Sequence, residues 1–234
     1  MRRAIGCGVL GCLLGAAVAQ TQPDVGGILK KVGETYRAAT QYELAAKLSV
    51  VENGTSTTGH MRFAFKAPDR YRMEGAIPGL MPDEAGSTGA VVVYDGSALW
   101  FYLPASNQYG SIPASAMTGD AAGDLEDVRP EAMDRFIMIR YRGAAEYAAS
   151  ARIIREEAMD FGGAKAECYV VTFTERERKT AYTWWIEKGR YRVLREDHAG
   201  SSTVYTTIEL NEALPDALFK FVPPAGARKA EFTQ

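Results

Sequence analysis

The sequence has few of the residues and motifs that usually carry catalysis. Its only two histidines, His60 and His198, lie far apart and cannot form a zinc-binding pair. No Gly-x-Ser-x-Gly elbow occurs, and His60 stands where the glycine spacing of residues 54–59 would need the lysine of a phosphate-binding loop. Carboxylates are plentiful, but their spacing marks out no catalytic pair. The sequence therefore predicts a protein that is not an enzyme and has no metal or cofactor.

Charge and cysteine content exclude two further classes. The 27 basic and 29 acidic residues give a net charge of -2, so no excess of Lys and Arg is available to bind nucleic acid. Cys7 and Cys12 lie in an N-terminal segment that we expect to be removed, which leaves Cys168 alone. Within the run AECYVVTF, a small buried side chain is favoured over a reactive or intermolecular thiol. No disulfide framework is expected.

The first 19 residues have the three regions of a secretory signal peptide. Arg2 and Arg3 give a basic start, residues 4–15 are apolar but too few to span a bilayer, and residues 17–19 (Ala-Val-Ala) fit the cleavage rule. We expect cleavage after Ala19 and export to the periplasm, with residues 20–234 forming one domain. A lipid anchor at Cys12 is the less favoured alternative, because apolar residues continue past it and Leu10 is bulky for that signal.

The dipeptide Asp95-Gly96 is the strongest local signal, since such a dipeptide between runs of Val, Tyr, Trp and Leu is typical of a hairpin turn. A two-residue turn there would pair Tyr94 with Ser97. Alternation then places Val92 and Phe101 on one face of the sheet, and their neighbours along each strand on the other. Both faces are apolar, so the hairpin is expected to be covered on both sides, either within a core or with one face lining a cavity.

Period-two patterning recurs along most of the chain and predicts a mainly β (α+β) fold of about eleven strands. Besides the hairpin, strands are expected at residues 42–52, 60–66, 70–74, 107–112, 152–161, 167–174, 179–187, 190–197 and 203–210. A polar turn of Gly, Ser and Thr is expected at 53–59, and a helical turn with a last short strand before Pro223-Pro224. An antiparallel sheet of this size has to curl or close.

Two helices are expected to cover the concave side of that sheet. Asp24 can cap a helix that follows it, and Pro130 suits the first turn of a helix reaching about Tyr141. The acidic residues of 117–131 favour a loop that caps this second helix over a calcium site, because their spacing is not that of an EF-hand. The second helix is Met-rich; a buried core helix is favoured over a lid on a lipid-sized cavity.

Five stretches together resemble the bacterial outer-membrane lipoprotein carrier superfamily (LolA and LolB), which also includes the sensor domain of the sigma-E regulator RseB. They are residues 28–51, 63–74 (FAFKAPDRYRME), 92–109 (VVYDGSALWFYLPASNQY), 183–196 (TWWIEKGRYRVLRE) and 214–227 (LPDALFKFVPPAGA). The resemblance implies an open, half-closed antiparallel β-barrel with helices on its concave face and a cavity for acyl chains. The partners it implies are acyl chains of lipoproteins or lipids, and an inner-membrane release complex or outer-membrane acceptor.

On this resemblance, a periplasmic carrier that shields acyl chains for outer-membrane sorting is the first expectation, and an RseB-type envelope-stress sensor that binds a membrane protein is the alternative. The expected cavity residues are aromatic or aliphatic, with the Trp100 face of the hairpin turned inward: Trp100, Tyr102, Val91, Val93, Phe63, Phe65, Met133, Phe136, Ile137, Met138 and Trp184. One position departs from the family. The carriers have an arginine, which helps to hold the lid and release cargo, where this chain has Ala67, so that release mechanism is not carried over.

Overall fold

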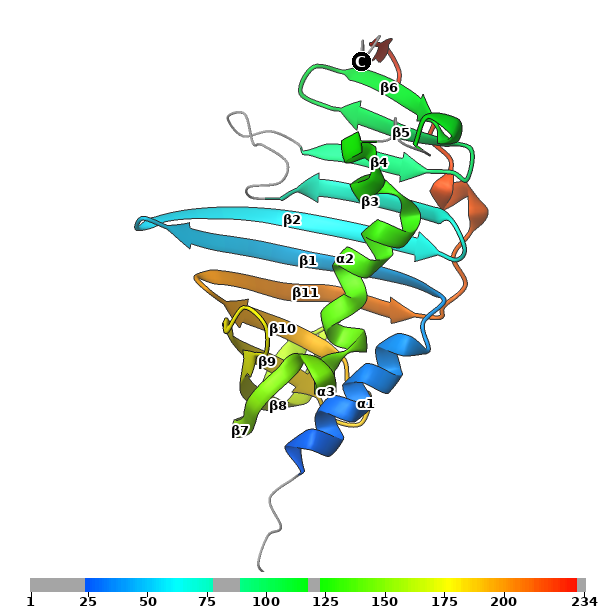
Figure 1. Cartoon of the computed structure of the whole chain (residues 1–234). Coiled ribbons are helices and arrows are strands. Elements are labelled where there is room, and N and C mark those ends of the chain that lie inside the picture. The colour runs from blue at the N-terminus through cyan, green and yellow to red at the C-terminus, as the bar shows by residue number, and fades with distance from the viewer. Residues whose placement is uncertain (1–23, 78–88, 118–122, 231–234) are drawn as a thin grey trace, which may run out of the picture.

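Strand pairing joins two meanders into one sheet in the computed structural model, which describes residues 24–77, 89–117 and 123–230 (Figure 1). The first meander comprises β1 (Gln41–Glu52), β2 (Thr55–Lys66), β3 (Arg70–Ala76), β4 (Ala90–Tyr94), β5 (Ala98–Leu103) and β6 (Gln108–Pro113). The second comprises β7 (Ala148–Phe161), β8 (Ala164–Glu175), β9 (Ala181–Glu187), β10 (Val193–His198) and β11 (Ser201–Leu210). The expected signal peptide lies outside the described residues.

Antiparallel pairing of β1 with β11 joins the two meanders, and the sheet stays open. The described strands follow the order β12-β6-β5-β4-β3-β2-β1-β11-β10-β9-β8-β7, in which the two-residue β12 (Arg228–Lys229) pairs in parallel with β6. Among the described strands, β12 and β7 are the two edges of the sheet and do not pair with each other. This confirms the expected open, antiparallel barrel-like fold with helices. The predicted last strand before Pro223-Pro224 is wrong: a 3-10 helix, η3 (Asp216–Phe219), is followed by irregular backbone.

Two turns differ from the sequence prediction in position. The turn after β1 is only Asn53-Gly54, because both residues have the positive φ (50° and 79°) of a type I′ hairpin, and β2 therefore begins at Thr55 rather than after residue 59. The β4–β5 turn is Gly96-Ser97, one residue later than expected. Its register pairs Tyr94 with Leu99 instead of Ser97.

The Asp95 carboxylate accounts for that later turn. It accepts hydrogen bonds from the backbone N–H groups of Ser97 (2.8 Å) and Ala98 (2.9 Å) and from the indole Nε1 of Trp100 (2.8 Å). Gly96 supplies the positive φ of 94° that the first turn position needs. Because the shift moves each pairing by an even number of residues, the predicted division of the hairpin into two apolar faces is correct.

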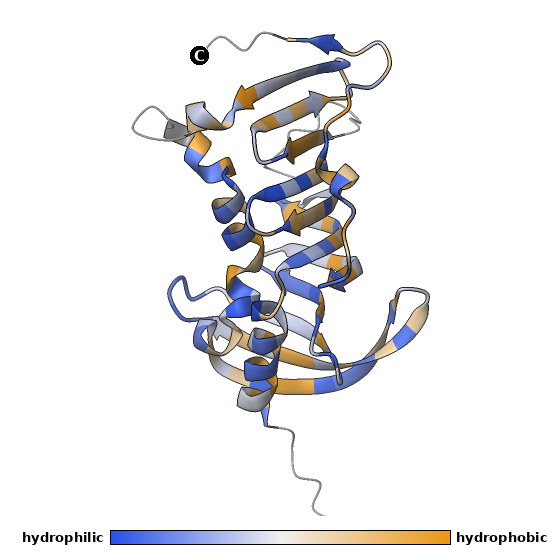
Figure 2. Cartoon of the chain, turned by 90° about the vertical axis from the view of Figure 1, so that its right-hand side faces the viewer, coloured by the Kyte–Doolittle hydropathy of each residue, from blue (hydrophilic) through white to orange (hydrophobic). Residues whose placement is uncertain are grey.

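Helices cover one face of the curved sheet (Figures 1 and 2). They are α1 (Val25–Arg37), α2 (Pro130–Arg142) and the short α3 (Ala144–Tyr147), with 3-10 helices η1 (Ala114–Met117) and η2 (Gly123–Val128) between β6 and α2. The Asp24 carboxylate caps α1 by accepting from the Gly26 N–H at 3.0 Å, as expected. Within the described residues no helix is long and apolar enough to cross a bilayer.

The inner face beneath the helices carries a row of aromatic rings. Tyr42 stacks on Phe65 across β1 and β2, and Tyr71 of β3 stacks on Phe63 of β2 and on Tyr94 of β4, with ring centroids 5.5–6.1 Å apart. The row forms because these residues occupy alternate positions on paired strands and so project to the same side. Large aromatic rings bury much apolar area, so this row makes the centre of the core.

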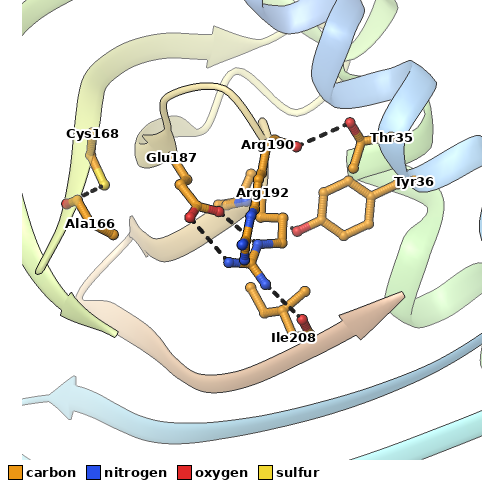
Figure 3. Close-up of polar contacts among 9 residues, drawn as sticks. Thr35, Tyr36, Ala166, Cys168, Glu187, Arg190, Arg192 and Ile208 are labelled. Carbon is orange, nitrogen blue, oxygen red and sulfur yellow. Dashed lines mark hydrogen bonds and ion pairs between the residues drawn. The ribbon is translucent and has the colours of Figure 1, made fainter. Parts of the chain in front are cut away.

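Tyr36 and Thr35 fasten α1 to the second meander, next to the contacts that Arg192 makes within that meander (Figure 3). The Tyr36 hydroxyl accepts from the Val193 N–H at 3.0 Å, and Arg192 pairs with Glu187 at 2.6 Å while donating to the Ile208 carbonyl at 2.9 Å. The Tyr36 contact therefore holds α1 against the start of β10, and the Arg192 contacts join the end of β9 to β11. Cys168 is fully buried in β8 beside the Ala166 carbonyl, and burial raises the pKa of its thiol to about 12, which agrees with the interpretation as a small core residue.

The C-terminal segment covers the face opposite the helices. Lys66 and Arg70 pair with Asp216 at 2.7 Å and 3.1 Å, and Phe219 is buried. Further on, Phe221 stacks on Trp100 with centroids 5.5 Å apart and also contacts Tyr102 and Tyr109. The segment therefore shields the outer apolar face of the hairpin from water.

We predict that Phe221→Ala lowers the free energy of unfolding by about 2 kcal/mol, because it removes a half-buried ring and three aromatic contacts. Urea unfolding followed by tryptophan fluorescence measures this. Val222→Ala is the control, since Val222 is 77% exposed and its change should stay within about 0.5 kcal/mol. Equal effects of the two substitutions would contradict the role given to Phe221.

Candidate ligand pocket

A pocket of about 770 Å³ lies between α2, the inner face of β3–β4 and the β8–β9 turn. This volume is within the range of small-molecule sites. Its lining combines apolar side chains with a set of charged ones: Tyr71, Met73, Val92, Val128, Ala132, Met133, Phe136, Ile139 and Tyr147, and Asp127, Arg135, Arg140, Glu175, Glu177 and Arg178.

The apolar side chains of the pocket wall are placed by the alternation of residues along the strands and by the helical spacing of residues along α2. On the sheet, Met73 of β3 pairs with Val92 of β4, and Tyr71 lies two residues along β3 on the same face. On α2, Ala132, Phe136 and Ile139 recur at helical spacing. The sheet wall is well covered, with Met73 only 6% exposed, whereas the large side chains of Phe136 (59% exposed) and Ile139 (54%) lie open to solvent.

Polar contacts fix α2 over the sheet near its C-terminal half. The buried Glu196 carboxylate of β10 accepts from Arg140 Nη1 at 2.5 Å and from the Trp184 indole at 2.8 Å. Burial lowers the pKa of Arg140 and the Glu196 charge raises it; the net direction is upward, so Arg140 stays charged. The Asp134 carboxylate of α2 accepts from the Tyr42 hydroxyl of β1 at 2.9 Å, and Arg142 of the same helix pairs with that carboxylate at 2.9 Å.

Of the sequence-predicted cavity residues, Met133 and Phe136 line the pocket. Phe63, Phe65, Met138 and Trp184 are on the helix-covered side but at most 5% exposed, and Ile137 packs against the same core. The first four belong to the hydrophobic core, Ile137 is partly buried against it, and none of the five lines the pocket. The helix α2 is therefore both a core helix and a wall of the pocket. Its residues Met133, Met138 and Tyr141 are buried, and Phe136 lines the pocket.

The predicted orientation of the hairpin is wrong. Val92 is the hairpin residue that lines the pocket, so Val91, Val93, Trp100 and Tyr102, which pair with one another across the hairpin, lie on the opposite face. Phe221 covers that face. The two faces are equally apolar in sequence, and only the distant C-terminal segment and α2 decide which of them faces the pocket.

Sequence reasoning missed most of the lining. Tyr71 and Met73 stand in a strand whose alternation with arginines was evident, and this pattern could have identified them as inward-facing. Tyr147 of α3 and residues 175–178 reach the pocket because the β8–β9 turn is joined to α3, where the Arg176 N–H donates to the Tyr147 carbonyl at 3.1 Å, and no local pattern records this contact. No group of His, Cys, Asp and Glu suited to a metal ion occurs among the described residues.

The family model that matches this chain describes a predicted periplasmic protein, DUF2092, and the match covers residues 27–233. One curated relative, an uncharacterized protein of Methanocaldococcus jannaschii, is 23% identical over 215 residues, which cover 88% of this chain and 54% of that protein. The chain thus spans about half the length of the curated relative it matches.

Solved structures share the fold at low sequence identity. Lipoprotein LppX of Mycobacterium tuberculosis has a TM-score of 0.50 and 12% identity, with 83% of this chain and 99% of that chain covered. Matches also include the MucA/MucB complex of Pseudomonas aeruginosa (0.43, 16%, covering 84% and 60%) and a LolA superfamily protein of Nitrosomonas europaea (0.33, 14%, covering 83% and 96%). The match to LppX shows that the two proteins share a fold, and it bears on the fold alone.

We predict that Glu196→Gln lowers the free energy of unfolding by about 2–3 kcal/mol. Breaking a buried ion pair usually costs about 3–5 kcal/mol, and the partial exposure of Arg140 reduces this, because its freed charge can be hydrated. Urea unfolding measures the loss, and a double-mutant cycle with Arg140→Gln should show coupling. Glu209→Gln, on an exposed residue of β11, is the control. A loss no larger than that of the control would contradict the anchoring role.

Proposed function

The chain belongs to the DUF2092 family of predicted periplasmic proteins, and from that premise we propose that it is a periplasmic binding protein for the acyl chains of lipids or lipoproteins. The function is carriage: the chain would shield an acyl chain from water in the pocket beneath α2, without chemical change to it. Transfer of lipoproteins for outer-membrane sorting is the specific form of this proposal that the carrier-like fold suggests.

The single observation that supports it best is the apolar pocket with Phe136 and Ile139 left open beside it. Neighbouring large apolar side chains exposed on a helix often mark a binding surface. Each buried CH₂ group of an acyl chain contributes about 0.8 kcal/mol, so even part of a chain held against Met73, Val92 and Phe136 gives useful affinity. No polar chemistry is required for that gain.

The firm attachment of α2 fits a role as the cover of such a site. Arg140 pairs with Glu196 of β10, and the Tyr141 hydroxyl lies 2.8 Å from that of Tyr205 on β11, so these two residues tie the last turns of α2 to the sheet. The pocket side chains of the preceding turns are free of those contacts. An acyl chain can therefore enter beside Phe136 without breaking the ion pairs that hold the helix.

We predict that the exported protein carries a bound species of lipid or acyl-peptide mass, which is displaced by a triacylated lipopeptide. Native mass spectrometry of the chain purified from a bacterial periplasm measures both. Phe136→Asp should weaken retention at least tenfold, because it places a charge against the acyl chain.

Val51→Asp is the matched control. Val51 is 51% exposed, comparable to Phe136, but lies at the end of β1 away from the pocket, so binding should be unchanged. A clean unliganded mass that stays the same after lipopeptide is added would overturn the proposal. The alternative, an RseB-type domain that binds a membrane protein, would then be the function to test by pull-down.

A further inference from the structure

The charged side chains around the pocket fall into two groups. Arg140 is held by Glu196, and the buried Glu175 carboxylate accepts from the backbone N–H groups of Glu177 (2.9 Å) and Arg178 (2.8 Å), which fixes the β8–β9 turn. Those two charges serve the fold. The remaining four are Asp127, Arg135, Glu177 and Arg178, and within the described part of the chain none of their side chains forms an ion pair.

Arg135 and Arg178 approach the pocket from two separate elements. Arg135 directly precedes Phe136 on α2, and Arg178 stands on the turn after β8. Both side chains belong to exposed residues, whereas the pocket wall formed by Tyr71 and Met73 is buried. Polarity therefore increases from the sheet towards the solvent. An amphiphile placed with its chain against the sheet would have its head group beside the two guanidinium groups.

We propose that the ligand of this pocket is an amphiphile with an oxyanionic head group, in the first instance a phospholipid, whose phosphate is bound by Arg135 and Arg178. This inference rests on the proposed function and adds the head-group chemistry to it. A guanidinium group offers parallel N–H donors that match the oxygens of a phosphate, and such charge-assisted hydrogen bonds are stronger than neutral ones.

The two acidic side chains on the rim limit what the arginines can attract. Asp127 and Glu177 balance the two positive charges, so the rim does not concentrate anions in general. A free inorganic phosphate gains only the arginine contacts, whereas a phospholipid gains these together with burial of its chain. A head group that also carries an ammonium group, as in phosphatidylethanolamine, is compatible with the rim because Glu177 directly precedes Arg178.

The test compares two lipids with identical acyl chains, phosphatidylglycerol and neutral diacylglycerol, in displacing the neutral apolar fluorophore N-phenylnaphthylamine from the full exported chain. Wild type should bind the phospholipid at least tenfold more tightly. The double variant Arg135→Gln/Arg178→Gln should lose that preference and keep its affinity for diacylglycerol.

Arg152→Gln/Arg190→Gln is the matched control. It removes the same charge from two exposed arginines that lie outside the pocket lining, and the preference should remain. Equal binding of the two lipids by wild type, an unchanged preference in the pocket variant, or displacement by inorganic phosphate alone would overturn the head-group inference while leaving the acyl pocket intact. Failure of both lipids to bind wild type would instead refute the proposed function.

Discussion

A hairpin with two apolar faces has to be covered on both, and the layers on either side of this sheet meet that constraint. The β4–β5 hairpin has Val92 and Phe101 on one face and Val93 and Trp100 on the other. Helices cover the inner face and the C-terminal segment, through Phe221, covers the outer one. Because the sheet does not close into a barrel, the helices and the C-terminal segment can each pack on a different face of it.

The pocket lies where the inner cover is incomplete. Two helices, α1 and the last turns of α2, pack against the sheet next to β1 and β11. There the ring of Tyr36 stacks on that of Tyr141, with ring centroids 4.9 Å apart. Beside β3 and β4 the helix leaves a pocket, which Met73 and Val92 line from the sheet. Glu196 of β10 binds Arg140, and Asp134 of α2 accepts from the Tyr42 hydroxyl of β1, so polar contacts add to the apolar packing that holds α2 over the sheet.

Local patterns predicted most of the strands, whereas the open barrel was expected from the family resemblance, and neither identified most of the pocket. Alternation and turn residues identified the strands and the two faces of the hairpin, because each depends on neighbours along the chain. The choice between those faces depends on Phe221, about 120 residues from Trp100, and on α2, so the prediction that Trp100 faces inward failed. Phe136 and Met133 were found because they stand on an amphipathic helix, whereas Arg178 enters the pocket only through the packing of a distant turn.

The most direct test of the central claim is photo-crosslinking with a phospholipid that carries a diazirine at mid-chain, followed by mass-spectrometric mapping of the modified residues. The account predicts adducts on the inner side of the sheet and on α2, at residues such as Met73, Met133 and Phe136. Adducts concentrated on Trp100, Tyr102 and Phe221 would place the acyl chain on the outer face and would contradict it.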